Sequence, residues 1–318
     1  MIITILVIFF NMFLLFFPQI VLSAAREGLL LWFNNVLPSL LPFIIATNML
    51  VALGFVASAG KFLAPVMHFV FKLPGAAGFG LVTGLTSGYP MGAKTVGDLC
   101  RTNQLTPQQA QHLLAFSNNA GPLFILGVVG VGMFQCVRVG YILWAAHVLA
   151  ALILGMLLRP GTVHKNSNYR GGVGDSPIIG GEVHQGLVQP KNPGKILGEA
   201  VKNAMESMTL IGGLIIFFSV VVAVIGELGL PVDSVWGSVL AGMIEVTGGV
   251  HKLSANGVSV VALGAAAFIV AFGGLSVHAQ SLHFTAGTGI RALPYLLAKI
   301  LHGIIAAGLT VILWSIGN

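Results

Sequence analysis

Residues 106–122 read TPQQAQHLLAFSNNAGP and contain both a helix start and an abrupt helix stop. Thr106 as the N-cap, Pro107 at the first helical position and Gln109 as the third form a capping box, which predicts a helix beginning at Pro107. The helix should end at Phe116, because Ser, Asn, Asn, Ala, Gly and Pro follow. A helix of about ten residues is only ~15 Å long.

The chain as a whole has the composition of a membrane protein. Of the 318 residues, 56% are hydrophobic and 8% are charged, and the mean hydropathy is +0.95, whereas about a quarter of a soluble domain is charged. The stretches without Asp, Glu, Lys or Arg are residues 1–25, 28–60, 73–93, 102–137, 139–158, 207–226, 253–290 and 300–318. A membrane helix needs roughly 20 apolar residues, so we expect an all-α polytopic membrane protein with about eight to ten membrane segments.

The short helix predicts a helix break, an interruption of the helix inside the bilayer, because it is half as long as a ~30 Å hydrocarbon core. Asn118 and Asn119 should therefore lie near the midplane. Polar and Gly-rich breaks also occur at residues 84–90, 242–249 and 272–278. The two breaks of each half have a similar offset, from 84 to 117 and from 242 to 273. Such matching interruptions predict two inverted repeats with broken or re-entrant helices around a transporter binding site.

A polar stretch divides the chain into two membrane halves. Residues 160–199 are rich in Gly, Pro and Asn, which is typical of a flexible linker, and their excess of Lys and Arg favours the cytoplasmic side. The predicted first half, residues 1–159, has an N-terminal transmembrane helix over residues 1–25 and then repeat 1. The predicted second half, residues 200–318, is repeat 2.

The breaks predict a polar cavity, because each unpaired backbone group in the bilayer costs several kcal/mol. Half-helix N-termini at the cavity would attract an anionic group. Ionisable side chains at membrane depth are expensive, so Glu245 and His278 are candidates for proton coupling, with a structural pairing as the alternative. Tyr89 and Phe272 are suited to stack on a flat ring. The candidate substrate-binding residues are Thr86, Ser87, Tyr89, Lys94, Ser117, Asn118, Asn119, Glu245, Thr247, Ser276, His278 and Gln280.

Enzyme, metal and nucleic-acid motifs are absent from the sequence. No HExxH, GxSxG or Rossmann fingerprint occurs, and GYPMGAKT at residues 88–95 lacks the Gly-Lys pair of a P-loop. Cys100 and Cys136 form no CxxC and belong to no set with metal spacing. The basic residues behind the net charge of +6 stand singly at segment ends. We therefore expect no enzyme activity, no cofactor, no metal and no nucleic-acid partner.

Several strings resemble the YlbJ family of bacterial sporulation integral membrane proteins, within the nucleoside recognition, or gate-domain, superfamily. They include SGYPMGAK at residues 87–94, FSNNAGPLF at 116–124, EVTGG at 245–249 and GGLSVHAQ at 273–280. The resemblance covers most of the chain outside the linker. It implies a permease for dipicolinate, a pyridine dicarboxylate, in the outer forespore membrane of a sporulating bacterium. Because the chain is shorter than expected for this branch, a paralogue outside sporulation is the alternative.

Three functions follow from these observations. The first is a secondary transporter of a small polar or anionic solute in the bacterial cell membrane, with a proton or a sodium ion as the candidate coupling ion. The second is a transporter of nucleosides or other small acids, as the superfamily name implies. The third is a non-transporting gate or scaffold subunit, as in the gates of ferrous iron transporters. The expected partners are the lipid bilayer and a small-molecule substrate, and a homodimer is an open alternative.

Overall fold

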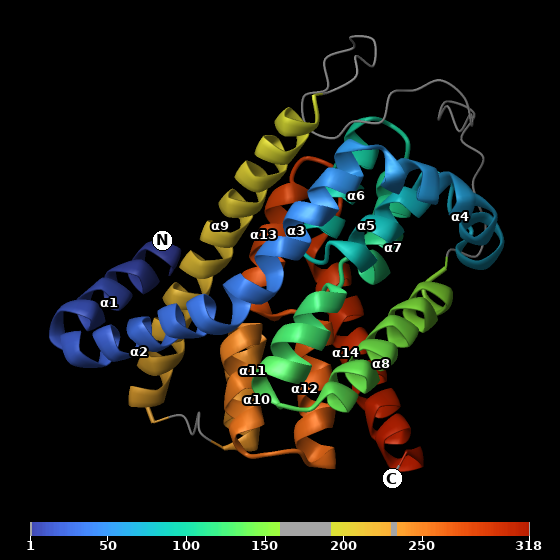
Figure 1. Ribbon diagram of the computed structural model, residues 1–318. Coiled ribbons are helices and arrows are strands. Elements are labelled where there is room, and N and C mark those ends of the chain that lie inside the picture. Colours follow the sequence, from blue (N-terminus) through green and yellow to red (C-terminus); the bar gives the residue numbers. More distant parts are fainter. Residues whose placement is uncertain (1, 160–191, 230–233, 318) are drawn as a thin grey trace.

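The structure, a computed structural model, describes residues 2–159, 192–229 and 234–317, and every element in these ranges is a helix (Figure 1). The first half contains α1 (Ile2–Phe16), α2 (Pro18–Leu31), the π-helical η1 (Trp32–Val36), α3 (Leu37–Ala52), α4 (Phe55–Phe71), α5 (Ala77–Thr86), α6 (Met91–Arg101), α7 (Pro107–Ser117), the π-helical η2 (Phe124–Met133) and α8 (Val137–Leu157). The second half contains α9 (Pro193–Glu227), α10 (Val235–Ile244), α11 (Val246–Ala255), α12 (Val260–Phe272), α13 (Gly274–Phe284) and α14 (Ala292–Ile316).

Helix length and surface character confirm the predicted all-α polytopic membrane fold. In the described residues, four spans are long and apolar enough to cross a membrane: Val137–Leu157, Pro193–Glu227, Val260–Phe284 and Ala292–Ile316. Shorter apolar helices accompany them, such as Ala77–Thr86 and Val235–Ile244. Large apolar side chains also cover the outside, and Phe62 and Phe69 are 84% and 82% exposed. A water-soluble monomer rarely exposes so much apolar surface, whereas lipid covers it without cost.

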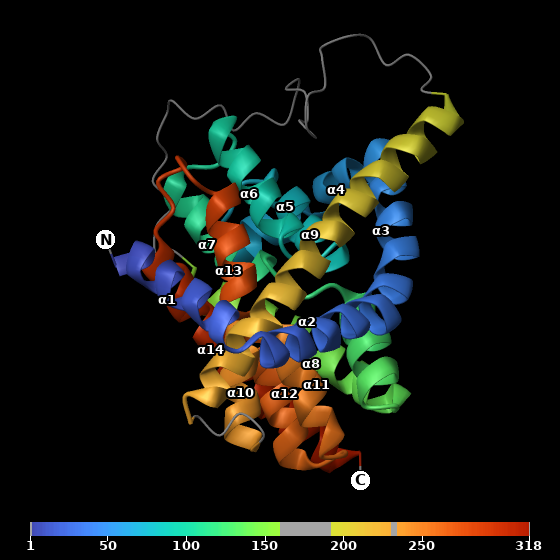
Figure 2. The same ribbon diagram turned by 90° about the vertical axis from the view of Figure 1, so that its left-hand side faces the viewer.

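The N-terminal apolar run forms two helices, so the single helix expected over residues 1–25 is wrong. The chain bends by 103° between Val7–Phe16 and Pro18–Val36. Proline has no N–H to donate and fits best in a first helical turn, so Pro18 starts a new helix instead of continuing α1. α2 then packs against α9, and Figure 2 shows the two helices crossing.

The two halves have the same order of elements around their breaks. The series α5, α6, α7, η2 and α8 corresponds in order and approximate length to α10, α11, α12, α13 and α14. α5–α7 and α10–α12 lie toward opposite ends of the molecule (Figures 1 and 2). This arrangement supports a repeat, and the inverted relation of the two halves stays a prediction.

The breaks of the first half pack against each other. α7 has the predicted start, since the Thr106 and Gln109 side chains form the reciprocal capping box, and it runs through Ser117. The backbone N–H of Tyr89 in the first break donates to the carbonyl of Asn119 in the second, at 2.6 Å. A Cβ on Gly88 would lie 2.6 Å from the Gly121 nitrogen, so the two breaks approach more closely than side chains permit.

The breaks of the second half form a similar pair. The third break, predicted over residues 242–249, is a sharp corner at Glu245 alone, because α10 ends at Ile244 and α11 begins at Val246. The Glu245 side chain supplies the acceptors that let α11 begin at the next residue. The fourth break is made by Gly273 and Gly274, whose φ values of 96° and 71° favour glycine. A Cβ on Gly274 would lie 3.2 Å from the Ile244 carbonyl oxygen, so this break lies against the third.

The predicted linker falls mostly outside the described residues, which omit residues 160–191. Residues 193–199, which the prediction assigned to the linker, are the first two turns of α9. The Asn192 side chain accepts the Gly194 N–H at 2.9 Å, and Pro193 occupies the first helical position. These are ordinary helix-start signals that a reading by composition overlooks. The domain boundaries themselves stay a prediction.

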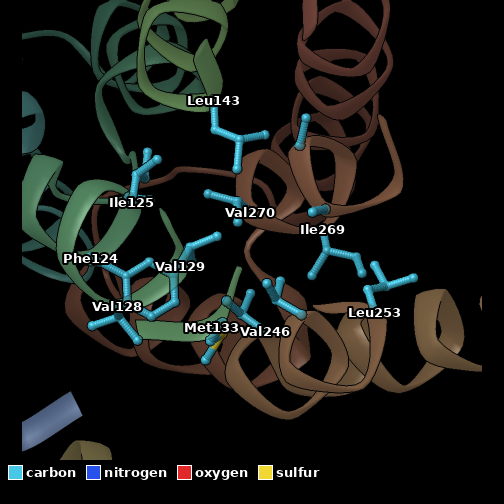
Figure 3. Packing of buried hydrophobic residues seen from close by; sticks show 14 of the residues in the cluster. Phe124, Ile125, Val128, Val129, Met133, Leu143, Val246, Leu253, Ile269 and Val270 are labelled. Atoms are coloured by element: carbon cyan, nitrogen blue, oxygen red, sulfur yellow. The ribbon is translucent and has the colours of Figure 1, made fainter. Parts of the chain in front are cut away.

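The largest apolar core joins the two halves (Figure 3). η2 contributes Ile125 and Val129, and Val129 points toward Val270 of α12. Val246 of α11 belongs to the same cluster. α14 packs on both α12 and α8, so the last helix also connects the halves. Because this core is shared, the breaks of both halves are held in one body around the site described below.

Candidate functional site

All four breaks contribute to one cavity in the described part of the chain. Its volume is about 90 Å³, several times the ~10–15 Å³ that one water needs on this measure. The first break contributes Ser87, Tyr89 and Pro90, and the second contributes Gly121. The third contributes Glu245, Val246 and Thr247, and the turn after the fourth contributes Ser276, Val277 and Gln280. The predicted cavity at the breaks is therefore present, with room for a small solute.

The remaining cavity wall is apolar and comes mainly from two helices. α3 contributes Leu40, Phe43 and Ile44, and α9 contributes Ile211, Leu214 and Ile215. These helices pack on each other, and the Asn48 side chain of α3 donates to the Ala200 carbonyl of α9 at 3.2 Å. The site thus has a polar side made of breaks and an apolar side made of α3 and α9, as small-solute sites commonly do.

Glu245 is the one charged side chain among the described residues that line the cavity. It is 6% exposed, and its two carboxyl oxygens accept the backbone N–H groups of Thr247 and Gly248 at 2.9 and 2.7 Å. A carboxylate in this position satisfies the free donors of α11 and interacts favourably with the helix dipole. Glu245 therefore occupies the half-helix N-terminus that we expected to face an anionic solute.

The N-terminus of α13 lies at the cavity and, unlike that of α11, has no acidic side chain as its cap. It follows Gly273, and within the described residues no side chain caps its first N–H groups. Ser276 and Val277 of its first turn line the cavity. Backbone N–H groups and the positive dipole end at this position are suited to a carboxylate or another acceptor on a solute.

Six of the predicted site residues lie outside the cavity lining. The Thr86 hydroxyl donates to the Val82 carbonyl of its own helix at 2.7 Å. Lys94 is half-buried on α6. Phe272, expected to stack on a solute, contacts the His278 ring instead, with ring centres 4.5 Å apart. The six residues outside the lining are Thr86, Lys94, Ser117, Asn118, Asn119 and His278.

Asn118 and His278 belong to a buried network behind the cavity. The Asn118 amide donates to the Ser281 hydroxyl at 2.8 Å and to the Tyr295 hydroxyl at 2.7 Å. The Tyr295 hydroxyl also lies 3.2 Å from Nδ1 of His278. Since the Tyr295 oxygen already accepts from Asn118, its proton is free to go to His278 Nδ1. Helices α7, α13 and α14 are thus tied together by side chains that are all buried.

Lys299 of α14, which is not among the residues predicted from the sequence, is a buried cation in this region. Its ammonium donates to the Asn118 carbonyl at 2.9 Å and lies 2.9 Å from Nδ1 of His302. His302 in turn contacts the His147 carbonyl of α8, and Nε2 of His147 accepts the Ala120 N–H at 3.2 Å. The sequence did contain a signal for it: Lys299 is the one Asp, Glu, Lys or Arg residue of α14. A charged residue at membrane depth is expensive and therefore indicates a functional site.

Asn118→Ala is expected to destabilise the fold by about 1–3 kcal/mol, because the Ser281 and Tyr295 hydroxyls lose a buried partner. The measurement is thermal unfolding of the purified protein in detergent. Asn256→Ala is the matched control, since Asn256 is exposed and its amide donates only to the Lys252 carbonyl in the described structure. If the two variants lowered the unfolding temperature equally, a structural role for the buried network would be contradicted.

Among the described residues, no group of three or more His, Cys, Asp or Glu is placed to hold a metal ion. What the fold and cavity define is a multi-pass, all-helical membrane protein with a cavity at the meeting point of its helix breaks. Residues 33–157 match the family model Gate, described as nucleoside recognition.

The whole chain has a curated relative. It is 34% identical over 320 residues to the sporulation integral membrane protein YlbJ of Bacillus subtilis (strain 168), in an alignment that covers 94% of this chain and 78% of that protein. The chain therefore belongs to the YlbJ family. Neither match is described as an enzyme. No solved structure matches the chain.

Proposed function

We propose that this protein is a secondary transporter of a small polar or anionic solute. The observation that carries the proposal is the cavity to which the four helix breaks of both halves contribute. Broken helices that meet around a central site are typical of transporters working by alternating access. Movement of the α3 and α9 wall relative to the break region would open the cavity.

The proposed solute is a flat acid, and dipicolinate is the first candidate. Tyr89 offers an aromatic ring at the cavity, and the free N-terminus of α13 offers N–H donors to a carboxylate. Lys94 and His278, two of the predicted substrate-binding residues, lie outside the lining. Membership of a family with a sporulation protein supports a solute that moves during sporulation, and the outer forespore membrane is then the proposed location.

Two alternatives are tested together with this proposal. The family model is described by nucleoside recognition, and Ser87, Thr247 and Gln280 at the cavity would also suit a nucleoside. The other alternative is a gate or scaffold subunit that moves no solute by itself. Both alternatives predict a different outcome in the same assay.

The experiment is uptake of labelled dipicolinate into proteoliposomes that hold only the purified protein, with a labelled nucleoside in parallel vesicles. We expect dipicolinate uptake that unlabelled dipicolinate competes away. Nucleoside uptake instead would retain the transporter and replace the solute. If neither compound moves, the transporter proposal is wrong for the isolated chain, and the subunit alternative is favoured.

Two leucine substitutions on one turn of α13 test whether transport uses the cavity. Gln280→Leu removes a polar group from the cavity wall, whereas Ala279→Leu adds the same side chain at an exposed neighbouring position. We expect strongly reduced uptake for Gln280→Leu and wild-type uptake for Ala279→Leu, at equal amounts of reconstituted protein. Equal uptake by the two variants would place the pathway elsewhere.

A further inference from the structure

Lys299 is a buried cation without an acidic partner. Its side chain is 1% exposed, and the two salt bridges found within the described residues, Arg101 with Asp98 and Lys195 with Glu199, lie elsewhere. An uncompensated buried charge costs several kcal/mol, and a group in such a place tends to neutralise. The ammonium form of Lys299 is therefore poorly compensated in the interior.

The hydrogen bonds of the Lys299–His302 pair indicate how many protons it holds. His302 Nε2 lies 3.1 Å from the His147 carbonyl, which only accepts, so Nε2 carries a hydrogen. Nδ1 of neutral His302 is then an acceptor for the Lys299 ammonium at 2.9 Å. If the proton moves to Nδ1, the neutral Lys299 amine becomes the acceptor in the same contact. The two nitrogens thus share one transferable proton.

The other groups around the pair are neutral donors and acceptors. α8 contributes His147, α13 contributes His278, and α14 itself contributes Tyr295. α7 contributes the Asn118 carbonyl, while its His112 contacts the Gly155 carbonyl instead. α12, which packs on α14, has no titratable residue in its sequence. Nothing among these described groups offsets the charge.

We propose that Lys299 and His302 form a proton-binding site that carries the coupling proton of transport. This inference rests on the proposed transporter function and names its coupling ion. One proton would enter the pair when the site faces one side of the membrane and leave it when the site faces the other. Between these steps the proton stays shared by Lys299 Nζ and His302 Nδ1.

The site is connected to the cavity through the second break. Lys299 holds the Asn118 carbonyl, and the next carbonyl, of Asn119, accepts the backbone N–H of Tyr89 in the cavity wall. A charged ammonium donates more strongly to a carbonyl than a neutral amine does. Loss of the proton therefore loosens the hold on Asn118 and, through Asn119, the position of Tyr89.

The two residues first considered for proton coupling are less suited to it. Both carboxyl oxygens of Glu245 already accept backbone N–H groups, so a proton there would weaken the cap of α11. Nδ1 of His278 is already used by Tyr295. The Lys299–His302 pair can bind or release a proton and keep the same contact between its nitrogens.

The test separates two activities of the protein in proteoliposomes. Exchange of labelled for unlabelled dipicolinate at equal pH needs no net proton movement, whereas accumulation under a pH gradient does. Lys299→Arg keeps a permanent cation and its donors but cannot release a proton. We expect this variant to retain exchange and to lose gradient-driven accumulation. Wild-type accumulation by Lys299→Arg would overturn the proposal and leave Lys299 as a structural tie.

Two further variants make the result interpretable. Lys202→Arg on α9 is the matched control, because Lys202 is exposed, and it should leave both activities unchanged. If Lys299→Arg does not fold, His302→Gln replaces it, since an amide has an acceptor oxygen and a donor NH2 group but does not bind the shared proton. His302→Gln should shift the pH dependence of accumulation, and an unchanged pH dependence would overturn the proposal.

The proton site of Lys299 and His302 can also be tested without transport, so its failure is distinguishable from failure of the transporter proposal. If the wild-type protein moves no solute, nitrogen NMR of the lysine side chains tests the proton site directly. The proposal expects one amine signal, absent from Lys299→Arg, that changes between charged and neutral forms as the pH is varied. A Lys299 signal that stays charged throughout would overturn the proton site.

Discussion

A Gly84→Ala substitution is expected to prevent the protein from reaching its folded state. Gly84 lies at the end of α5, and a Cβ there would overlap the carbonyl oxygen of Ser117 at the end of α7. The nearest atoms, the carbonyl oxygen and carbonyl carbon of Ser117, belong to the backbone, so no side-chain rotation relieves the overlap. We expect a loss of more than about 4 kcal/mol, the range of exceptional single substitutions. The measurements are the yield of monodisperse protein in detergent and its thermal unfolding.

The second half offers a companion to this test. A Cβ on Gly249 of α11 would overlap the Cα of Gly242 in α10, so Gly249→Ala should be as damaging as Gly84→Ala. Gly213→Ala in α9 and Gly308→Ala in α14 are the controls, because nothing lies within 4 Å of a Cβ at either position. Alanine favours helices, so the controls should be neutral or slightly stabilising. Wild-type yield and unfolding of Gly84→Ala would contradict this close approach of the breaks.

Glu245→Ala is expected to reduce solute uptake by at least about tenfold. The variant leaves the N–H groups of Thr247 and Gly248 without their acceptor at the cavity, and each such loss costs about 1–3 kcal/mol. This loss favours states in which the α11 N-terminus is displaced from the cavity. Since ~1.4 kcal/mol corresponds to a factor of ten in an equilibrium, it is large enough to reduce uptake tenfold. The measurement is initial uptake into proteoliposomes at matched protein content.

Glu245→Gln distinguishes two contributions of the side chain, its hydrogen bonds that cap α11 and its negative charge. The amide oxygen can still accept one backbone N–H, but the side chain carries no negative charge. We expect uptake between that of the wild type and that of Glu245→Ala, and Glu206→Gln at an exposed position of α9 should have no effect. Wild-type uptake by Glu245→Ala would show that the third break takes no part in transport.

The features predicted correctly from the sequence depend on neighbouring residues. The capping box at Thr106 and the end of α7, one residue beyond the expected Phe116, depend on side chains within one helical turn. The bend at Gly273 and Gly274 depends on the freedom of glycine at positive φ. Two local features were misread: Pro18 divides the N-terminal run, and Pro193 begins α9 inside the predicted linker.

Which polar residues share a site depended instead on packing. Ser87, Glu245 and Gln280 meet at one cavity, while Asn118 and His278, predicted for the same site, lie in the network behind it. Residues one position apart on a helix point in different directions, so a small difference in helix orientation separates cavity from interior. Their assignment required the relative positions of α7, α13 and α14.

The order of helices and helix breaks was thus determined by the sequence, because capping residues, proline and glycine affect the backbone only within a few residues. The Lys299 site did not, because its partner Asn118 is 181 residues away and is reached only when α14 packs against α7 and α8. Hydrogen bonds between distant segments depend on the packing of many apolar side chains at once, and no short stretch of sequence contains that information.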